Sequence, residues 1–317
     1  MGILALLSII SLIHLLIALI LRITKLKNKI NPKVLFTFEL IYLDLSIIYI
    51  IASFIIGNLP PKIQEVAVEL EKFPIENYRI VQISDLHIGP LLRKDFLKKC
   101  IEQINSVSPH LVVITGDLID QPAEKISDIL ALLSTIRSQN GVYFVLGNHE
   151  YYNGAEMLIE KLKRFNVKPL INQNVKLSHK GKSFYLAGIS DQSGYRFNKL
   201  IPDLLKTLSG IEDNSSTILL SHRPSVIYNN LEKISNKVDL ILSGHTHGGQ
   251  ILPFNLFVRM REPYISGLHS LKNLKIYVNT GTGFWGPPIR FFERGEITLL
   301  NINPQKKIDT IIKTERH

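Results

Sequence analysis

A short apolar run leads directly into a polar triplet in the stretch Arg79-Ile80-Val81-Gln82-Ile83-Ser84-Asp85-Leu86-His87. The run is rich in branched apolar residues, which favours a β-strand, and the triplet follows at its end. From residue 78 onward, similar apolar runs alternate with stretches of helical periodicity. Strands that alternate with helices in this way predict an α/β fold.

The expected elements are spread over the chain after residue 78. Strands are expected at residues 79–83, 111–115, 142–146, 183–187, 217–220, 239–242, 275–278 and 296–300. Helices are expected at residues 93–107, 126–138, 155–164 and 225–234. The single cysteine, Cys100, lies in the first of these helices, where it is expected to be a buried structural thiol.

Five polar clusters each directly follow one of these expected strands. The clusters are Asp85-Leu86-His87, Gly116-Asp117-Leu118-Ile119-Asp120, Gly147-Asn148-His149-Glu150, Ser221-His222 and Gly244-His245-Thr246-His247-Gly248-Gly249-Gln250. Because the carboxyl ends of strands in an open α/β sheet converge on one crevice, residues far apart in sequence can share a site there. A single cluster would be best explained as a turn. Five in order, each at a strand end, indicate a functional site.

The side chains of these clusters have the chemistry of metal ligands. They are Asp, His and Asn without Cys, a set that suits divalent ions such as Mn, Fe or Zn. The candidate ligands are Asp85, His87, Asp117, Asn148, His222, His245 and His247. Seven ligands are more than one ion needs, and a carboxylate such as Asp117 can bridge two ions. The sequence therefore predicts two divalent metal ions.

In order, the clusters resemble the D-x-H, G-D-x-x-D, G-N-H-E, H and G-H-x-H motifs of the calcineurin-like metallophosphoesterases. The resemblance covers residues 78–301 and implies a two-sheet β-sandwich flanked by helices. The wider context of residues 83–90, 244–250 and 281–290 is similar to the bacterial membrane-associated branch of this family. That branch includes relatives of enzymes that hydrolyse the pyrophosphate bond of UDP-diacylglucosamine.

The resemblance also implies a role for each candidate residue. It assigns the first metal to Asp85, His87, Asp117 and His247, and the second to Asp117, Asn148, His222 and His245. It implies that His149 contacts the phosphate or protonates the leaving oxygen, and that Asp120 orients His149. The expected reaction is hydrolysis of a phosphomono- or phosphodiester by hydroxide that two metal ions activate.

Two features near the motifs leave alternatives open. Family members often carry a basic residue near Thr280, whereas this chain has none beside it, and Arg223 either compensates or is an ordinary surface arginine. Arg223 is therefore left outside the predicted site. Phe284 and Trp285 precede a Pro pair and are explained equally well by a substrate-contacting loop, a membrane boundary or core packing.

Two apolar stretches before the catalytic region predict a membrane anchor. Residues 3–21 are almost uninterrupted Leu, Ile and Ala, which is long enough to span the hydrocarbon layer as a helix. Residues 34–56 form a second stretch, in which Glu39 and Asp44 are costly at membrane depth. We expect an anchor at residues 1–57 with two spans, a linker at 58–77 and a metallophosphoesterase domain at 78–317.

The charge pattern predicts that the catalytic domain lies outside the cytoplasmic membrane. The basic residues between the two apolar stretches are Arg22, Lys25, Lys27, Lys29 and Lys33. A basic loop stays in the cytoplasm, so two spans return the chain to the outer side. A cleaved signal peptide is the alternative for residues 3–21, but no basic residue precedes that stretch.

The overall charge leaves two other functions to consider. The chain has 317 residues, a net charge of +10 and a pI near 9.5. The basic pI is the only feature that supports a nuclease. The basic loop explains part of that charge by topology, so no nucleic-acid partner is expected. A non-catalytic scaffold of the same fold is disfavoured, because every expected ligand position is filled. The predicted partners are a phosphate-ester substrate and the membrane, and the sequence does not allow any protein partner to be predicted.

Overall fold

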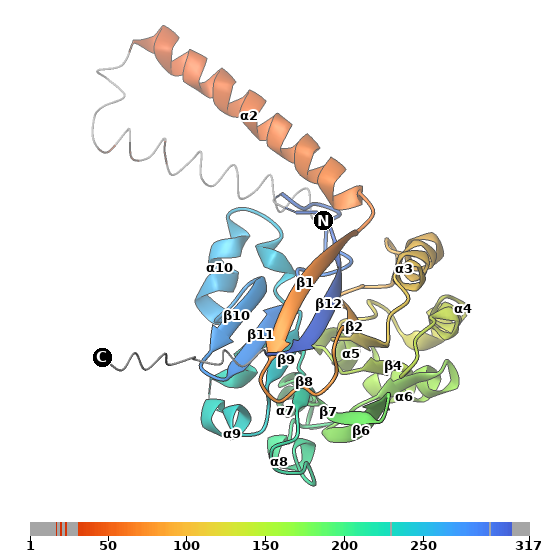
Figure 1. Cartoon of the computed structure of the whole chain (residues 1–317). Helices are drawn as coiled ribbons and strands as arrows, with labels where there is room; N and C mark the ends of the chain where they lie inside the picture. Colours follow the sequence, from red (N-terminus) through yellow and green to blue (C-terminus); the bar gives the residue numbers. More distant parts are fainter. Residues whose placement is uncertain are drawn as a thin grey trace, which may run out of the picture.

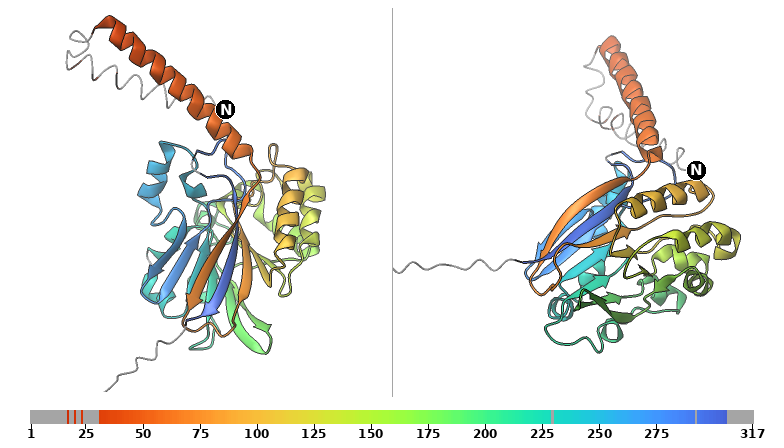
Figure 2. Two further views of the ribbon diagram at one scale, coloured as in Figure 1. Left: turned by 45° about the horizontal axis from the view of Figure 1, so that its top comes forward. Right: turned by 45° about the vertical axis from the view of Figure 1, so that its right-hand side comes forward.

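The computed structural model describes residues 31–228, 230–291 and 293–305, together with Ile17, Ile20 and Ile23. Two six-stranded sheets pack against each other, with helices on their outer faces (Figures 1 and 2). The first sheet has the order β1 (Lys62–Leu70), β12 (Glu296–Pro304), β2 (Tyr78–Ile83), β3 (Leu111–Ile114), β4 (Val142–Phe144) and β5 (Val167–Pro169). The second has the order β10 (Gly267–Leu271), β11 (Leu274–Val278), β9 (Leu240–Ser243), β8 (Thr217–Leu220), β7 (Lys182–Gly188) and β6 (Gln173–His179).

The central strands β3, β8 and β9 are buried on both faces, which explains why they are continuous apolar runs. In β3, Leu111 and Val113 join the apolar core between the sheets, whereas Val112 and Ile114 pack toward the helices. Successive side chains of a strand point to opposite faces, so one run of four apolar residues serves two cores. The expected two-sheet sandwich flanked by helices is confirmed.

The helices cover the outer faces of the sandwich. Buried residues of α3 (Lys94–Ser106), α4 (Ser127–Leu130) and α6 (Ala155–Arg164) pack on the first sheet. On the second sheet, α8 (Leu204–Thr207) and α9 (Leu231–Ser235) contribute Leu204 and Ile234 to a third core. Three further short helices are α5 (Asn148–Asn153), α7 (Ser193–Phe197) and α10 (Phe254–Arg261).

All eight expected strands are present, with ends shifted by a few residues, and four more strands join them. The additional strands are β1, β5, β6 and β10. Strand β1 lies within the segment 58–77 that was expected to be a linker, and it pairs in parallel with β12 at the edge of the first sheet. The helix expected at 126–138 is divided into α4 and two 3-10 turns, and the helix expected at 225–234 into a 3-10 turn and α9.

The second predicted span lies within a long helix that projects from the sandwich, α2 (Pro32–Asn58) (Figure 1). Among the described residues, α2 is the one helix that is long and apolar enough to cross a membrane, by its length and composition. Only 11% of its most apolar part is buried, which is unlike the core helix of a soluble domain. Apart from Ile17 and Ile20, the first predicted span at 3–21 lies outside the described residues.

Candidate active site

The structure brings all of the predicted site residues together at one end of the sandwich. Each cluster follows the carboxyl end of its strand: Asp85 and His87 after β2, Asp117 and Asp120 after β3, Asn148 and His149 after β4, His222 after β8, and His245 and His247 after β9. Strands β2 to β4 are parallel to one another, as are β8 and β9, so their ends share one edge in each sheet. The two edges meet at the site.

Five of these residues have left-handed backbone conformations, which residues other than glycine rarely adopt. The φ angles are 53° at Asp85, 48° at His87, 49° at Asp117, 70° at His245 and 50° at His247. Left-handed backbone at a residue other than glycine is strained, and such strain is concentrated at functional sites. The loops are therefore shaped to aim donor atoms inward at a cost in stability.

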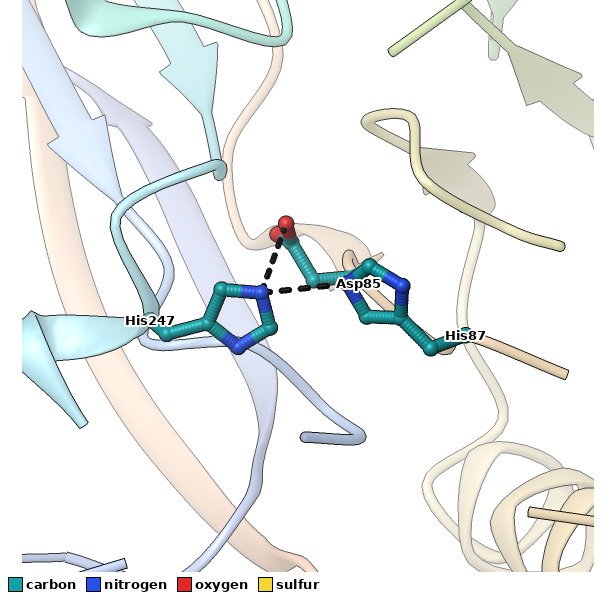
Figure 3. Close-up of side chains that lie close together, drawn as sticks. All are labelled: Asp85, His87 and His247. Carbon is teal, nitrogen blue, oxygen red and sulfur yellow. Dashed lines mark hydrogen bonds and ion pairs between the residues drawn. The ribbon is translucent and has the colours of Figure 1, made fainter. Parts of the chain in front are cut away.

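The first group of donors consists of Asp85, His87 and His247 (Figure 3). Nδ1 of His87 lies 2.7 Å from Oδ1 of Asp120, so His87 donates there and its Nε2 carries a lone pair. That Nε2 lies 3.1 Å from Nε2 of His247, which is 3.3 Å from Oδ1 of Asp85. Facing imidazole nitrogens beside a carboxylate repel one another unless a proton or a cation lies between them. This donor set fits a divalent cation.

The second group consists of Asp117, His222 and His245, with Asn148 beside them. Nδ1 of His222 donates to the carbonyl oxygen of Thr115 at 2.8 Å, which leaves Nε2 facing the group. Around that Nε2 lie Oδ2 of Asp117 at 3.3 Å, Oδ1 of Asn148 at 3.2 Å and Nδ1 of His245 at 3.1 Å. These four donors also fit a divalent cation.

Asp117 lies between the two groups. Its Oδ1 accepts a hydrogen bond of 2.8 Å from the backbone N–H of His149, which fixes the carboxylate. Its Oδ2 is 4.0 Å from Nε2 of His87 and 3.3 Å from Nε2 of His222. One oxygen of Asp117 thus faces a histidine of each group, so this carboxylate could be shared by two ions.

Charge compensation in the site follows from burial and close pairing. Burial opposes ionisation of Asp85, but His247 outweighs it and holds the pKa of Asp85 well below its ordinary value. Burial also opposes protonation of His222, but the charge and hydrogen bond of Asp117 raise the pKa of His222 to about 10. A cation bound here would take the place of this proton.

Asp120 links two histidines by hydrogen bonds. Nδ1 of His87 and Nδ1 of His149 each lie 2.7 Å from Oδ1 of Asp120. Burial alone would lower the pKa of His149, but the hydrogen bond to Asp120 and the nearby carboxylates raise it to about 8. Burial raises the pKa of Asp120, yet these two hydrogen bonds hold it below its ordinary value. His149 therefore carries a proton near neutral pH, with Nε2 toward the site.

No role was predicted for Glu150, whose carboxylate connects two loops of the site. Its carboxylate accepts from the backbone N–H of Asp117 at 2.9 Å, Leu118 at 2.7 Å and Gly147 at 2.6 Å. Burial and the charge of Asp117 raise the pKa of Glu150 to about 7. Glu150 lies in the first turn of α5, three residues after Gly147. This spacing favours a hydrogen bond back to the Gly147 N–H, and it could have identified Glu150 from the sequence.

Arg223 contacts two predicted ligand residues, so the alternative of an ordinary surface arginine is wrong. Its Nε donates to Oδ2 of Asp191 at 2.9 Å, and its Nη2 donates to Oδ1 of Asn148 at 3.1 Å. Its Nη1 lies 2.7 Å from Nε2 of His245. Asp191 follows the end of β7, as the other clusters follow their strands, and this placement would have identified it.

A second arginine supplies positive charge near Thr280, where the sequence has no adjacent basic residue. The buried guanidinium of Arg290 donates from Nη2 to the carbonyl oxygen of Thr280 at 2.9 Å. The same nitrogen is 3.4 Å from Nδ1 of His247. Arg290 thus backs His247 from the side away from the donor group.

The fold and the donor groups define an α/β sandwich protein with a candidate metal centre at its strand ends. Residues 78–249 match the calcineurin-like phosphoesterase family, and the chain belongs to that family. It is accordingly a phosphoesterase, a hydrolase whose family uses metal ions.

Known proteins similar to this chain are named as metallophosphoesterases or phosphatases. An uncharacterized metallophosphoesterase of Campylobacter jejuni is 37% identical over 271 residues, which cover 85% of this chain and 70% of that protein. A bovine transmembrane protein with a metallophosphoesterase domain is 35% identical over 253 residues, covering 76% of this chain and 57% of that protein. A solved dimetal phosphatase from Danio rerio has a TM-score of 0.45 and 14% identity, covering 68% of this chain and 90% of that structure. The apolar helix α2 and the transmembrane relative together suggest membrane association.

Proposed function

We propose that this chain hydrolyses a phosphomono- or phosphodiester with two divalent metal ions, Mn, Fe or Zn. The observation that supports it is the convergence of seven donor residues in two groups, with one oxygen of Asp117 facing a histidine of each group. The first ion would be held by Asp85, His87, Asp117 and His247. The second would be held by Asp117, Asn148, His222 and His245. Two bound ions lower the pKa of water and neutralise charge on the phosphate.

His149 would protonate the leaving oxygen. Asp120 engages its Nδ1, so Nε2 is the nitrogen left to face the substrate, and it lies 3.9 Å from Oδ2 of Asp117. A pKa of about 8 keeps the ring protonated at neutral pH, as a general acid requires. Asp120 acts as a positioning residue, because it fixes the orientation and the tautomer of the imidazole.

Arg223 is proposed as a further phosphate contact. Asp191 holds its Nε, which leaves the two terminal nitrogens directed at Asn148 and His245 at the edge of the second donor group. A guanidinium in this position would neutralise a phosphate oxygen and raise the affinity for the substrate. Its loss should raise KM more than it lowers kcat.

The proposed substrate is a phosphate ester or pyrophosphate carried by a membrane lipid or another envelope component. The support is the apolar helix α2, which would hold the site close to a bilayer. In this proposal residues 1–57 are a two-span anchor and residues 78–317 are the catalytic domain, outside the cytoplasm. The motifs resemble a family branch that includes relatives of UDP-diacylglucosamine hydrolases, so a lipid-linked pyrophosphate is the first substrate to test.

The experiment uses the full-length chain in lipid nanodiscs. Bound metal is removed with a chelator, counted by mass spectrometry, and replaced with Mn²⁺. Hydrolysis is then measured on p-nitrophenyl phosphate, its bis ester and a UDP-diacylglucosamine-type lipid. We expect activity to be lost on chelation and to return as the metal content reaches two ions per chain. Full activity after chelation, or full activity with one ion per chain, would refute the dinuclear proposal.

A further inference from the structure

Helix α10 carries its large apolar side chains on the side that faces solvent. Leu256, Phe257 and Met260 are 57%, 61% and 80% exposed, and their spacing of three and four residues places them on one face. The buried residue of this helix is the polar Asn255. A helix that rests on a soluble domain normally shows the reverse pattern, with its apolar face buried.

Two aromatic rings extend this face. The ring of Phe254, at the start of α10, stacks on Trp285 with centroids 5.7 Å apart and lies 6.2 Å from the ring of Phe257. Phe254 and Trp285 are both more than one-third exposed. The docking surface is defined here as Phe254, Leu256, Phe257, Met260 and Trp285. A contiguous exposed apolar patch of this kind marks a contact with a membrane or a protein.

The docking surface lies beside the junction of α2 with the domain. The hydroxyl of Tyr49 in α2 is 3.2 Å from both the backbone nitrogen and the carbonyl oxygen of Leu252, two residues before Phe254. The backbone N–H of Arg290 donates to the carbonyl oxygen of Ser53 at 2.9 Å. Both Figure 1 and the left view of Figure 2 show α10 at the end of the domain from which α2 projects. A membrane that holds α2 would therefore be adjacent to α10.

The positive charge on α10 favours contact with a lipid surface that carries anionic headgroups. The helix carries two exposed arginines, Arg259 and Arg261, and no acidic residue. Aromatic and aliphatic side chains together with arginines are the composition of helices that lie in the membrane interface. We propose that the docking surface rests in the interfacial layer of the bilayer that holds α2, with anionic headgroups around Arg259 and Arg261.

Docking of α10 would also determine the side from which a substrate reaches the site; this step rests on the proposed function. A cavity of about 200 Å³ lies between α10 and the first donor group, and its lining includes His247, Arg259 and Arg290. With the docking surface in the interface, this cavity lies at the depth of the lipid headgroups. A phosphate carried by a lipid would reach the metal centre from the bilayer side.

Trp285 is the single tryptophan of the chain, so its fluorescence reports on the docking surface directly. The full-length chain is reconstituted in vesicles of phosphatidylglycerol and phosphatidylcholine with brominated acyl chains. We expect the brominated lipid to quench Trp285, and aqueous iodide to have little effect, because an interfacial helix buries its apolar face about 5–10 Å deep. Quenching by iodide without quenching by brominated lipid would refute docking. Protection from both quenchers would indicate a protein partner or a second copy, and would also refute it.

Charged substitutions on the face provide the second test. Phe257→Asp and Met260→Asp should each lose most of the quenching by brominated lipid and gain quenching by iodide. Leu205→Asp is the matched control, because Leu205 is 73% exposed on α8, away from α2, and should leave both signals unchanged (Figure 1). Thermal unfolding confirms that each variant is folded, and Met260→Asp, at the most exposed of these positions, keeps the test valid if Phe257→Asp does not fold. Unchanged quenching in a folded Met260→Asp variant would contradict the proposal.

Activity separates this inference from the proposed function. Hydrolysis of the soluble substrate bis-p-nitrophenyl phosphate should be equal in Met260→Asp and in the unsubstituted chain, because Met260 lies outside the donor groups. A chain that docks but hydrolyses no phosphate ester would refute the proposed function alone. A chain that hydrolyses the ester with no quenching by brominated lipid would refute the docking alone.

Discussion

At the scale of single residues, hydrogen bonds decide which nitrogen of each histidine faces the site. Nδ1 of His87 and Nδ1 of His149 are engaged by Asp120, and Nδ1 of His222 is engaged by the carbonyl oxygen of Thr115. In each ring the other nitrogen is left for a ligand or a substrate. Such outer contacts fix the tautomer and the ring orientation, so the donor geometry exists before an ion binds.

Removal of one donor charge should separate metal binding from folding. Asp117→Asn keeps the shape of the side chain and the hydrogen bond from the His149 N–H, but it removes the negative charge. Loss of an outer partner of a metal site costs about 10–100-fold in affinity or activity, so loss of this proposed ligand should cost more than about 100-fold. Metal content and turnover are measured together, and His245→Ala should behave in the same way.

The matched control is Asp213→Asn, because the side chain of Asp213 is 93% exposed and the residue precedes β8, at the opposite end of that strand from His222. It should keep full activity and metal content. If Asp117→Asn retains two ions per chain and normal turnover, the assignment of Asp117 as the bridging ligand is wrong.

His149→Ala should keep its metal ions and lose rate by about 10²- to 10⁴-fold on alkyl phosphate esters, the range for a general acid. The loss should be much smaller on p-nitrophenyl esters, since a good leaving group needs little protonation. The folded pKa of His149 is raised from 6.5 to about 8, so the proton is present below pH 8 and is lost as the pH rises through it. Two bound divalent ions oppose the proton on His149 and lower this pKa, so activity on alkyl esters should fall as the pH rises through a value at or below about 8, and His149→Ala should lack this limb. An equal loss on both ester types would indicate phosphate binding instead.

At the scale of elements, the sequence predicts the central strands well and the edge strands poorly. The central strands are buried on both faces and therefore read as apolar runs, whereas β6 has the exposed and polar sequence Gln-Asn-Val-Lys-Leu-Ser-His. Strand β1 pairs with β12, more than 200 residues away, and no local pattern reveals that pairing. The strand-end rule located the predicted ligands, but the contacts of Glu150, Arg223 and Arg290 depend on tertiary packing.

Close packing of two site loops predicts the effect of Gly244→Ala. A Cβ at Gly244 would overlap Ser84 Oγ and Asp85 Oδ2, so the loop after β9 would be pushed from the loop after β2. Overpacking of this kind costs about 1–3 kcal/mol in the free energy of unfolding. Denaturant unfolding measures the cost, and activity should fall with it because His245 moves away from the site.

Ser84→Ala in the Gly244→Ala background removes the nearest overlapping atom. It should restore part of the stability, whereas Ser84→Ala alone should not stabilise the chain. If the double variant is as unstable as Gly244→Ala, the clash with Ser84 is not the cause.

At the scale of the whole molecule, the two sheets combine loops from both halves of the chain into one site. The loops after β2, β3 and β4 supply one wall, and those after β8 and β9 supply the other. Helix α2 contacts the sandwich domain through hydrogen bonds of Tyr49 and Ser53. A rigid contact between the anchor and the domain would set the direction in which the site faces relative to the membrane.

The last prediction is that the catalytic domain lies outside the cytoplasmic membrane, with the basic loop at residues 22–33 inside. An added cysteine can test this, because burial raises the pKa of the natural Cys100 to about 12 and keeps that thiol unreactive. In intact spheroplasts a membrane-impermeant maleimide should label Leu205→Cys and should label Asn28→Cys only after lysis. The unsubstituted chain, which should not react in either condition, is the control. The reverse pattern would place the domain in the cytoplasm, and labelling of both positions before lysis would show that they lie on the same side, so the count of two spans would be wrong.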